Sequence, residues 1–400
     1  MTQPTVGLQA LAISAPDQPE NVVTNDYWRT HFPELVERAE EKIWMWKKPK
    51  DWSEGSEIFN RTMAPFVLDP FRGARERRRL PKGGTALSLE VDAAEKALAA
   101  RGLEIGDIDL ILCTSFLPDS VGIGGATFLA QALGHDGAAW NLESACSSGT
   151  IGFMTACGLI QAGQYKRVLV MTSCVYSRVA QDDDPISWGV GDSAIAMIVG
   201  EVEADGAYLG GHTVHSAATC GAVSYTIDED AEGEPYFRLT MGKQGARLLR
   251  ETSEPYLKTC THGALGQAGL EVNDLDFIAV NTPLAWYATF CCKVLGLPTD
   301  RTLSVYPLYA NVGPALMGLN LFHAAAWGLI ERGQKVLLYS VGSVSSCAAV
   351  VMEWGDVALG PVPAGASLEH LRAIEAQTLV DAERQRQAIE ERHELDEQVA

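Results

Sequence analysis

The chain repeats part of its own sequence, and this repeat limits the folds that it can adopt. Residues 102–115 align with residues 269–282, and the two segments lie about 170 residues apart. Residues 158–163 match 328–333, and residues 167–173 match 335–341, at nearly the same spacing. Three matches at one spacing indicate that the 400 residues contain two related halves.

Both halves show the same alternation of strand and helix patterns. Short aliphatic and β-branched runs, at residues 108–113 and 167–172 in the first half, are typical of buried parallel strands. Residues 194–199 and 348–352 follow closely on the second strand of each half, where we expect antiparallel neighbours. Residues 147–163 have a long helical pattern. The sequence therefore predicts an α/β protein whose two halves bring equivalent loops to one shared site.

We divide the chain into three parts on this basis. The N-terminal half covers residues 1–210, with an insertion at about 31–56, and the C-terminal half covers residues 211–358. A Pro- and Gly-containing linker and an acidic helical tail occupy residues 359–400. The tail has only a weak apolar stripe, which favours a solvated helix over one that packs on the body.

Composition excludes several classes of function. A net charge of −20 argues against binding to nucleic acid or to an anionic membrane. No apolar run reaches the ~20 residues of a membrane span, and the N-terminus does not look like a signal peptide. Nine cysteines lie mostly in apolar stretches without a C-x-x-C pair, which is typical of reduced thiols in the cytoplasm. We expect no metal site.

Cys146 is the candidate nucleophile. It lies among small residues in the segment Asn141–Thr150, directly before the helical pattern at 147–163. The free N–H groups and the dipole at a helix N-terminus favour negative charge, which lowers the pKa of a thiol. Small neighbours let a substrate carbonyl reach the sulfur. Cys146 is therefore expected to carry an acyl group as a thioester.

Four segments of the chain resemble the thiolase superfamily. They are Ser-Ala-Cys-Ser-Ser at 144–148, Trp-Gly-Val-Gly-Asp-Ser-Ala at 188–194, Tyr-Ala-Asn-Val-Gly at 309–313, and the basic run at 71–80. Their order and spacing are most similar to the ketoacyl synthase III branch, which includes acyltransferases of natural-product pathways. The resemblance implies the thiolase fold, with duplicated βαβαβαββ halves in a layered α-β-α-β-α sandwich, and a homodimer.

The resemblance also implies a reaction. An acyl group would pass from CoA or acyl carrier protein to Cys146 and then to a second substrate, in ping-pong order. Backbone N–H groups of Cys146 and of the Gly342–Ser343 turn would form the oxyanion hole. Asn311 would donate a hydrogen bond in the pocket. No cofactor is implied, because the CoA or phosphopantetheine thioester is itself the substrate.

Further residues are candidates for binding this donor. Arg72, Arg75 and Arg77 of the basic run could dock CoA phosphates or a phosphopantetheine arm, although the same run could be a solvated or ion-paired face. Trp188 and Trp286 are expected to line or pack beside the pocket.

One catalytic residue of the family is missing. Family members use a Cys-His-Asn triad, and aligning the strand at 275–280 places Asn281 where the histidine belongs. His323 falls in the middle of a predicted helix and is expected to pack there. An amide cannot act as a general base near neutral pH, so decarboxylative condensation becomes doubtful. Glu143, Asp119 or the amine of the acceptor could supply the base instead.

Three functions remain open at this point. The first is an acyltransferase of natural-product, polyketide or fatty-acid-like biosynthesis that moves an acyl group through Cys146 to an alcohol, amine or thiol acceptor. The second is a decarboxylating 3-oxoacyl synthase in which Asn281 and Asn311 jointly stabilise an enolate. The third is a non-catalytic partner subunit of an active paralogue, which the missing histidine favours and the intact cysteine loop opposes.

Overall fold

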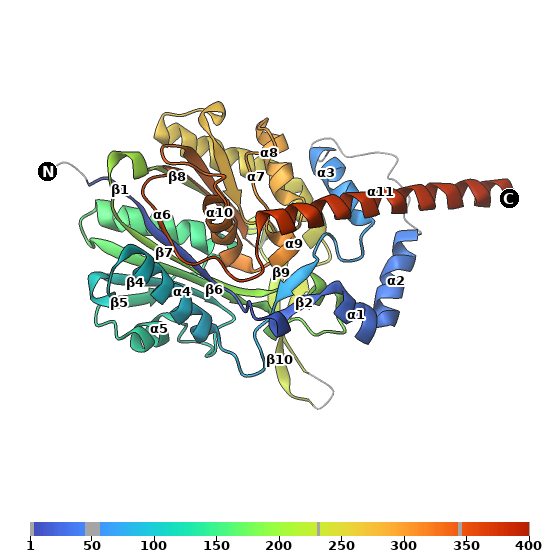
Figure 1. The fold of residues 1–400 in the computed structure, drawn as a ribbon, viewed down its shortest axis with the longest axis horizontal. Coiled ribbons are helices and arrows are strands. Elements are labelled where there is room, and N and C mark those ends of the chain that lie inside the picture. Colours follow the sequence, from blue (N-terminus) through green and yellow to red (C-terminus); the bar gives the residue numbers. More distant parts are fainter. Residues whose placement is uncertain (1–3, 45–56, 230–232, 343–345, 400) are drawn as a thin grey trace.

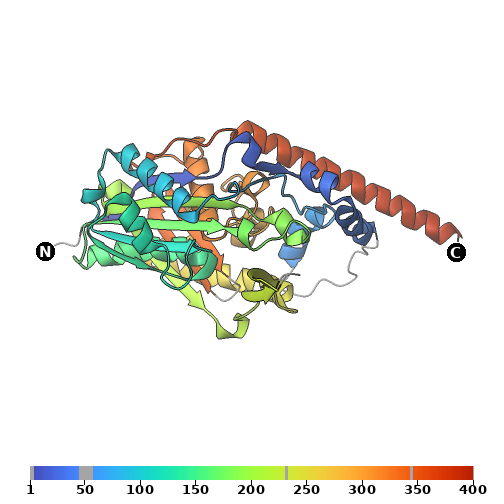
Figure 2. The same cartoon turned by 90° about the horizontal axis from the view of Figure 1, so that it is seen from below.

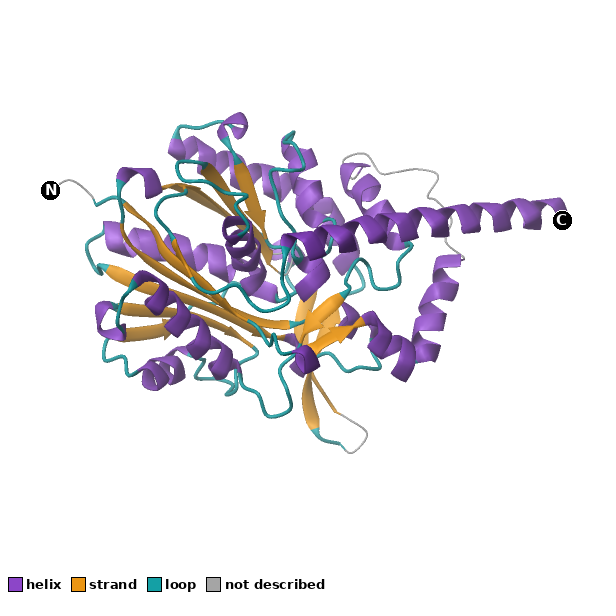
Figure 3. Cartoon of the chain, in the orientation of Figure 1, coloured by secondary structure: helices purple, strands orange, loops and turns teal. Residues whose placement is uncertain are grey.

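The computed structural model describes residues 4–44, 57–229, 233–342 and 346–399. Two β-sheets lie across the body of the molecule, with helices between them and on their outer faces (Figures 1 and 3). The arrangement is a layered α-β-α-β-α sandwich, as the sequence predicted.

The first sheet has six strands. Their spatial order is β14 (Ala358–Leu359), β1 (Val6–Ser14), β7 (Asp192–Glu201), β6 (Arg167–Val175), β4 (Leu110–Phe116) and β5 (Ala138–Asn141). Strand β4 pairs in parallel with β5 and β6, whereas β7 is antiparallel to both β6 and β1. The predicted antiparallel strand at 194–199 is therefore confirmed.

The second sheet repeats the central part of this order with two strands fewer. It consists of β11 (Phe277–Val280), β12 (Lys335–Gly342), β13 (Ser346–Glu353) and β8 (Tyr208–His215). Its β11-β12-β13-β8 order corresponds to β4-β6-β7-β1 of the first sheet. A single parallel bridge between Ile278 and Thr302 occupies the place that β5 has in the first sheet.

The central layer consists of α6 (Ser148–Gln161) and α10 (Leu316–Ala326). Nearly every residue of α10 is buried, and α6 contacts β6 of one sheet and β12 of the other. The outer face of the first sheet carries α4 (Ala86–Arg101) and α5 (Ala126–Leu133). The outer face of the second carries α7 (Gly245–Ala268) and α8 (Tyr287–Leu295).

The repeated residues have the same local roles in both halves. Gly102 ends α4 and Gly269 ends α7, both with left-handed backbone (φ 68° and 67°) that glycine adopts without a steric penalty. A short 3₁₀ turn with a capping box follows each glycine, at Ile105–Asp107 and at Val272–Asp274. The turn then leads into β4 or β11. The sequence repeat is thus a repeat of helix ending, cap and strand.

Additional elements surround one end of the sandwich. They are β2 (Val22–Thr24), α1 (Asn25–His31), α2 (Pro33–Trp44), α3 (Glu57–Val67), β3 (Glu76–Arg78) and α9 (Tyr306–Tyr309). The predicted insertion at 31–56 thus includes α2, while its residues 45–56 lie outside the described part of the chain. A hairpin of β9 (Val223–Glu229) and β10 (Pro235–Met241) extends away from the body (Figures 1 and 2).

The tail forms one long helix, α11 (Leu368–Val399). Its first part packs on the body, where Leu371 is fully buried and Ile374 joins the main core. Its later part projects beyond the rest of the molecule (Figure 2). The expectation of a solvated tail is therefore wrong for its first turns, because the weak apolar stripe finds partners on α3 and α9.

Candidate active site

Cys146 lies in a 3₁₀ turn, Ala145–Ser147, directly before α6. The preceding residue, Ala145, has a positive φ of 50°, which is unfavourable for a residue with a Cβ. Such a conformation persists only where the surrounding structure holds it. The turn leaves Cys146 partly exposed at the N-terminus of a buried helix.

Hydrogen bonds from several side chains hold this turn. The Ala145 N–H donates to Glu143 Oε1 at 2.6 Å. The Ser147 hydroxyl donates to the Ser144 carbonyl at 2.6 Å and lies 2.9 Å from the hydroxyl of Ser346 on β13. The second half of the chain therefore helps to fix the cysteine loop of the first.

Cys146 faces a cavity of about 290 Å³ with a mostly apolar lining. Its walls come from the 70–72 segment, from the turns after β6 and β11, from α9 and from the β9–β10 hairpin. The lining residues that bear on the chemistry are Arg72, Cys146, Tyr176, Trp188, Tyr225 and Asn311. No histidine lines the cavity among the residues that the structure describes.

Two tyrosines form the polar part of the cavity wall near the thiol. The Tyr176 Oη is 3.9 Å from Cys146 Sγ, and Tyr176 is only 4% exposed. Tyr225 enters from β9. Sequence reasoning missed both residues. The repeat offered a signal for Tyr176, because the turn after β6 corresponds to the turn after β12 where the oxyanion hole was expected, but nothing pointed to Tyr225.

Asn311 lies in a turn that matches the cysteine turn of the other half. Ala310 before it has a positive φ of 55°, and a 3₁₀ turn and α10 follow it. Its side-chain oxygen accepts from the Gly313 N–H at 2.9 Å. Its amide nitrogen is therefore the group available to a ligand in the cavity that Cys146 also lines.

Asn281 has a different position from the one that a catalytic role would need. Its Nδ2 donates to the Val341 carbonyl at 3.0 Å, and its Oδ1 accepts from the Val341 N–H at 2.8 Å. It is 1% exposed and is not among the residues that line the Cys146 cavity. Both ends of its amide join the end of β11 to the end of β12.

Gly342, which was predicted to belong to the oxyanion hole, lies against the cysteine loop. A Cβ placed on Gly342 would lie 2.9 Å from the Ser144 carbonyl oxygen and 3.0 Å from the Ser147 nitrogen, so only glycine permits this approach. The other predicted donor, Ser343, lies outside the described residues.

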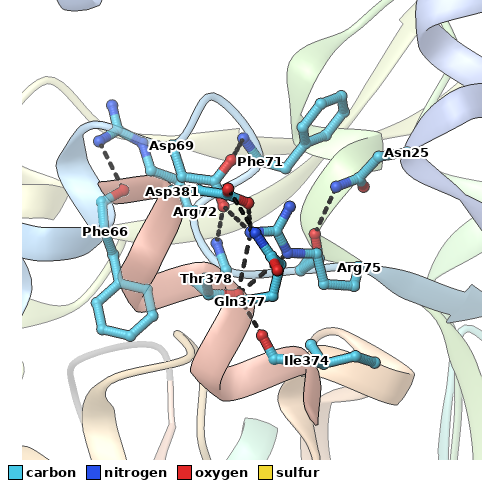
Figure 4. Close-up of polar contacts among 12 residues, drawn as sticks. Asn25, Phe66, Asp69, Phe71, Arg72, Arg75, Ile374, Gln377, Thr378 and Asp381 are labelled. Carbon is cyan, nitrogen blue, oxygen red and sulfur yellow. Dashed lines mark hydrogen bonds and ion pairs between the residues drawn. The ribbon is translucent and has the colours of Figure 1, made fainter. Parts of the chain in front are cut away.

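The three arginines of the basic run occupy three different environments. Arg72 lines the Cys146 cavity and its Nη1 donates to the Val67 carbonyl at 2.6 Å. Arg75 contacts α11: its Nε and Nη2 donate to Thr378 Oγ1 at 3.1 and 3.0 Å, and Asp381 lies 3.6 Å away (Figure 4).

Arg77 is fully buried, with its guanidinium 4.7 Å from the ring centroid of Trp28. It donates to the carbonyl of Trp188 and to the side chain of Asn25. Burial lowers the pKa of Arg77 to about 9. A phosphate in solution has no access to it, so the structure brings only Arg72 of the three to the cavity.

The two tryptophans lie on different sides of this region. Trp188 is buried beside Phe71 and lines the Cys146 cavity. Trp286 packs edge-on against Phe59 of α3 and lines a second cavity of about 520 Å³, which α3, α8 and α11 enclose.

The alternative bases and the distant histidine all have structural partners. Asp119 accepts from the N–H groups of Ala86 and Leu87 at the start of α4, and it pairs with Arg178. Burial alone would raise the pKa of Asp119, but the hydrogen bonds and the ion pair together hold it below its usual value. Glu143 binds the backbone of the cysteine turn. His323 is fully buried on α10, where its Nε2 lies 3.0 Å from Tyr309 Oη, as expected of a packing residue.

The described residues contain neither a candidate metal site nor a candidate membrane-spanning helix. No group of three or more His, Cys, Asp or Glu side chains among them could hold a metal ion. No helix in the described part of the chain is long and apolar enough to cross a membrane.

Comparison with known proteins agrees with this geometry. The family model for 3-oxoacyl-[acyl-carrier-protein] synthase III matches residues 140–218, and the model for its C-terminal part matches residues 265–354. The β-ketoacyl-[acyl-carrier-protein] synthase III of Bordetella petrii is 27% identical over 277 residues, which are 68% of this chain and 82% of the relative. Synthase III 2 of Streptomyces coelicolor is 29% identical over 286 residues, 70% of this chain and 83% of the relative.

Solved structures show the same fold. FabH of Pseudomonas aeruginosa has a TM-score of 0.68 at 19% identity and covers 88% of this chain and 98% of its own. OleA of Xanthomonas campestris has a TM-score of 0.70 at 18% identity, with coverage of 88% and 98%. These solved structures show that the protein has the thiolase fold. In its matches to the two family models and to the curated relatives, the chain is similar to the ketoacyl synthase III-like proteins of the thiolase superfamily.

Proposed function

We propose that the protein is an acyltransferase that carries the acyl group as a thioester on Cys146. In the first step the Cys146 sulfur attacks the thioester carbonyl of acyl-CoA or acyl carrier protein. A bond forms between Sγ and the acyl carbon, the donor thiolate leaves, and the proton of the Cys146 thiol ends on that thiolate. In the second step an alcohol, amine or thiol acceptor takes the acyl group and returns its proton to the Cys146 sulfur.

The placement of Cys146 is the observation that carries this proposal. The thiol lies at the N-terminus of α6, after a residue with a strained backbone, and faces an apolar cavity. The helix dipole favours its thiolate form. The apolar walls suit an acyl chain, and the relatives are named as synthases that act with acyl carrier protein.

We propose further that the acyl group is transferred without decarboxylative condensation. A condensing role for Asn281 would need its amide to face the thioester of a second substrate. Instead, each end of that amide binds the Val341 backbone, and Asn281 does not line the cavity. Asn311 alone would remain to polarise a carbonyl there, which favours transfer to an acceptor that is already nucleophilic.

We also propose that the active form is a cytoplasmic homodimer. Strand β5 is the edge of the first sheet, and apolar side chains gather in the sequence around it. Trp140 on β5 is 40% exposed, and Val121, Ile123 and Phe128 nearby in the chain are 71%, 66% and 36% exposed. An edge strand flanked by exposed apolar groups suits a symmetric pairing with a second copy. A sedimentation measurement that finds only monomer would contradict this.

The acyl-enzyme is tested by intact-protein mass spectrometry. The full chain is exposed to a panel of acyl-CoA and acyl carrier protein thioesters, with Cys146→Ala and Cys220→Ala alongside, since Cys220 is an exposed thiol outside the cavity. We expect a mass gain of one acyl group in the wild type and in Cys220→Ala, and none in Cys146→Ala. No gain from any donor would reject the acyltransferase and favour the partner-subunit function.

Release of carbon dioxide separates transfer from condensation. Labelled malonyl thioester is added to the acylated protein. We expect no carbon dioxide beyond the level with Cys146→Ala. Release that depends on both Cys146 and Asn281 would instead support the decarboxylating synthase.

A further inference from the structure

We infer that the phenols of Tyr176 and Tyr225 are the hydrogen-bond donors of this active site: Tyr176 donates to the Cys146 sulfur, and Tyr225 donates to the oxygen of the acyl group. The Tyr225 part rests on the proposed function, whereas the Tyr176 part concerns the thiol itself. Together they would supply polar contacts at a site that lacks the family histidine.

The geometry around the thiol supports the role of Tyr176. Its hydroxyl lies 3.9 Å from Cys146 Sγ, within the longer reach of a sulfur acceptor. It follows β6 directly, so the sheet fixes its backbone, and Phe116 packs edge-on against its ring. A donor held in this way stabilises a thiolate more than a thiol, because the bond to the charged form is stronger.

Tyr225 supplies the second observation. Its hydroxyl is buried and lies close enough to the Tyr176 hydroxyl to interact with it, but no partner lies within hydrogen-bond distance and angle limits among the described residues. Leaving such a group unpaired costs about 1–3 kcal/mol. A bound acyl oxygen would provide the missing acceptor, so this cost would be relieved when the substrate is present.

Both phenols stay protonated under ordinary conditions. Burial raises the pKa of Tyr176 well above its usual value, and the nearby Cys146 adds to this. Burial also raises the pKa of Tyr225, with a further contribution from Cys174. A phenol that keeps its proton can donate a hydrogen bond but cannot serve as a general base. The pair therefore supplies donors and leaves the task of proton acceptance to the acceptor substrate.

The surroundings of the thiol contain few other ionisable groups. Cys174 lies on β6 and its pKa is raised well above its usual value by burial, so it stays neutral. Glu143 is on the cysteine loop and is engaged with the Ala145 backbone. Arg72 is a cationic side chain in the cavity lining. Removal of one phenol leaves these three groups in place, so a change in the titration of Cys146 can be attributed to the lost hydroxyl.

The test uses the full chain with Tyr176→Phe, Tyr225→Phe and the matched control Tyr236→Phe. Tyr236 lies on the same hairpin as Tyr225 but does not line the cavity. The first measurement is the rate of alkylation of Cys146 by iodoacetamide against pH, followed on the peptide that contains it. It requires no acyl donor, so it stands even if the proposed function fails.

We expect Tyr176→Phe to shift the alkylation profile of Cys146 upward by about one pH unit, which is about tenfold in rate at a fixed pH on the rising limb. Tyr225→Phe and Tyr236→Phe should leave the profile in place. A profile of Tyr176→Phe that coincides with the wild type, in a variant with wild-type circular dichroism, would overturn the role of Tyr176.

The second measurement is the rate at which acyl-Cys146 forms from a donor that the wild type accepts. We expect Tyr225→Phe to slow it about 100-fold, the usual effect of losing one donor to a developing oxyanion, while Tyr236→Phe has no effect. An unchanged rate in Tyr225→Phe would overturn the role of Tyr225. If the wild type itself takes up no acyl group, the proposed function fails and the Tyr225 role fails with it, while the alkylation profile still decides the role of Tyr176.

Discussion

Ala145–Cys146 in the first half and Ala310–Asn311 in the second occupy equivalent turns. In both, an alanine with positive φ precedes the candidate residue and a buried central helix begins shortly after it. Cys146 lies within a 3₁₀ turn, whereas the 3₁₀ turn of the second half follows Asn311. The side chains differ in what they bind. Cys146 faces the cavity from a loop held by surrounding hydroxyl groups, whereas Asn311 uses its oxygen to hold its own turn. The same backbone turn is thus built twice, with a thiol on one copy and an amide on the other.

The largest expected effect comes from disturbing the contact between the two halves. Gly342→Ala would place a Cβ 2.9 Å from the Ser144 carbonyl and push on the cysteine loop from the second half. We expect the rate of Cys146 acylation to fall about 100-fold, because a small displacement of a reacting group has a large effect on rate.

The control for this substitution is Gly266→Ala on α7, where an added Cβ meets open space. It should leave acylation unchanged. A Gly342→Ala variant that acylates at the wild-type rate would mean that the cysteine loop is positioned by the first half alone.

A second prediction separates the two asparagines of the second half. Asn281→Ala would leave the buried N–H and C=O of Val341 without their side-chain partner, so we expect the free energy of unfolding to fall by about 2–3 kcal/mol. Asn311→Ala removes one hydrogen bond, from the Gly313 N–H, and should lower the free energy of unfolding by about 1 kcal/mol. It should reduce the rate of acyl transfer more than Asn281→Ala does. Urea denaturation of both variants measures the two free energies of unfolding. Equal losses would contradict the prediction that Asn281 stabilises the fold more than Asn311 does.

The smallest effect concerns the central helices. His323 on α10 corresponds to Phe153 on α6, and burial lowers the pKa of His323 to about 3. The unfolded chain binds this proton below about pH 6.5 while the folded chain does not, so the free energy of unfolding falls as the pH decreases from 6.5 toward 3. When the pH is lowered from 7 to 5.5, the free energy of unfolding of His323→Phe should therefore fall by about 1 kcal/mol less than that of the wild type.

Urea titrations at the two pH values measure this difference. His262→Phe, at an exposed position on α7, serves as the control and should retain the wild-type dependence. A His323→Phe variant with the same pH dependence as the wild type would show that other groups cause the loss.

Much of the fold could be predicted from the sequence because its signals are local. The repeat carries its own helix-ending glycine and capping box, at Gly102 and again at Gly269, so both strands that follow could be found. The hairpin was not predicted, because β9 and β10 lie outside the repeated segments. The sequence repeat also allowed the prediction that the turns of Cys146 and Asn311 meet, and both residues line one cavity.

The rest of the site depends on contacts between distant parts of the chain. Asn281 was expected in the pocket, but its partner is the backbone 60 residues away, and no sequence pattern reveals that pairing. Arg77 looked like a surface charge within a basic run, yet Trp28 and Phe71 enclose it. Tyr225 reaches the cavity only because the base of the β9–β10 hairpin forms part of the cavity wall.

The docking of α11 has a thermodynamic consequence. The second cavity is lined both by body residues, such as Arg61 and Trp286, and by Leu368, Arg372 and Leu379 of the tail. A molecule that contacts both the body and α11 in this cavity binds only when α11 is docked on the body. Its binding free energy therefore adds to the free energy that holds α11 in place. By reciprocity, the ligand favours the docking of α11 by the same factor by which docking raises the affinity for the ligand, so a change that loosens α11 also weakens ligand binding. The contacts of Arg75 with Thr378, which itself lines the cavity, and with Asp381, which does not, would then contribute to the affinity of this site.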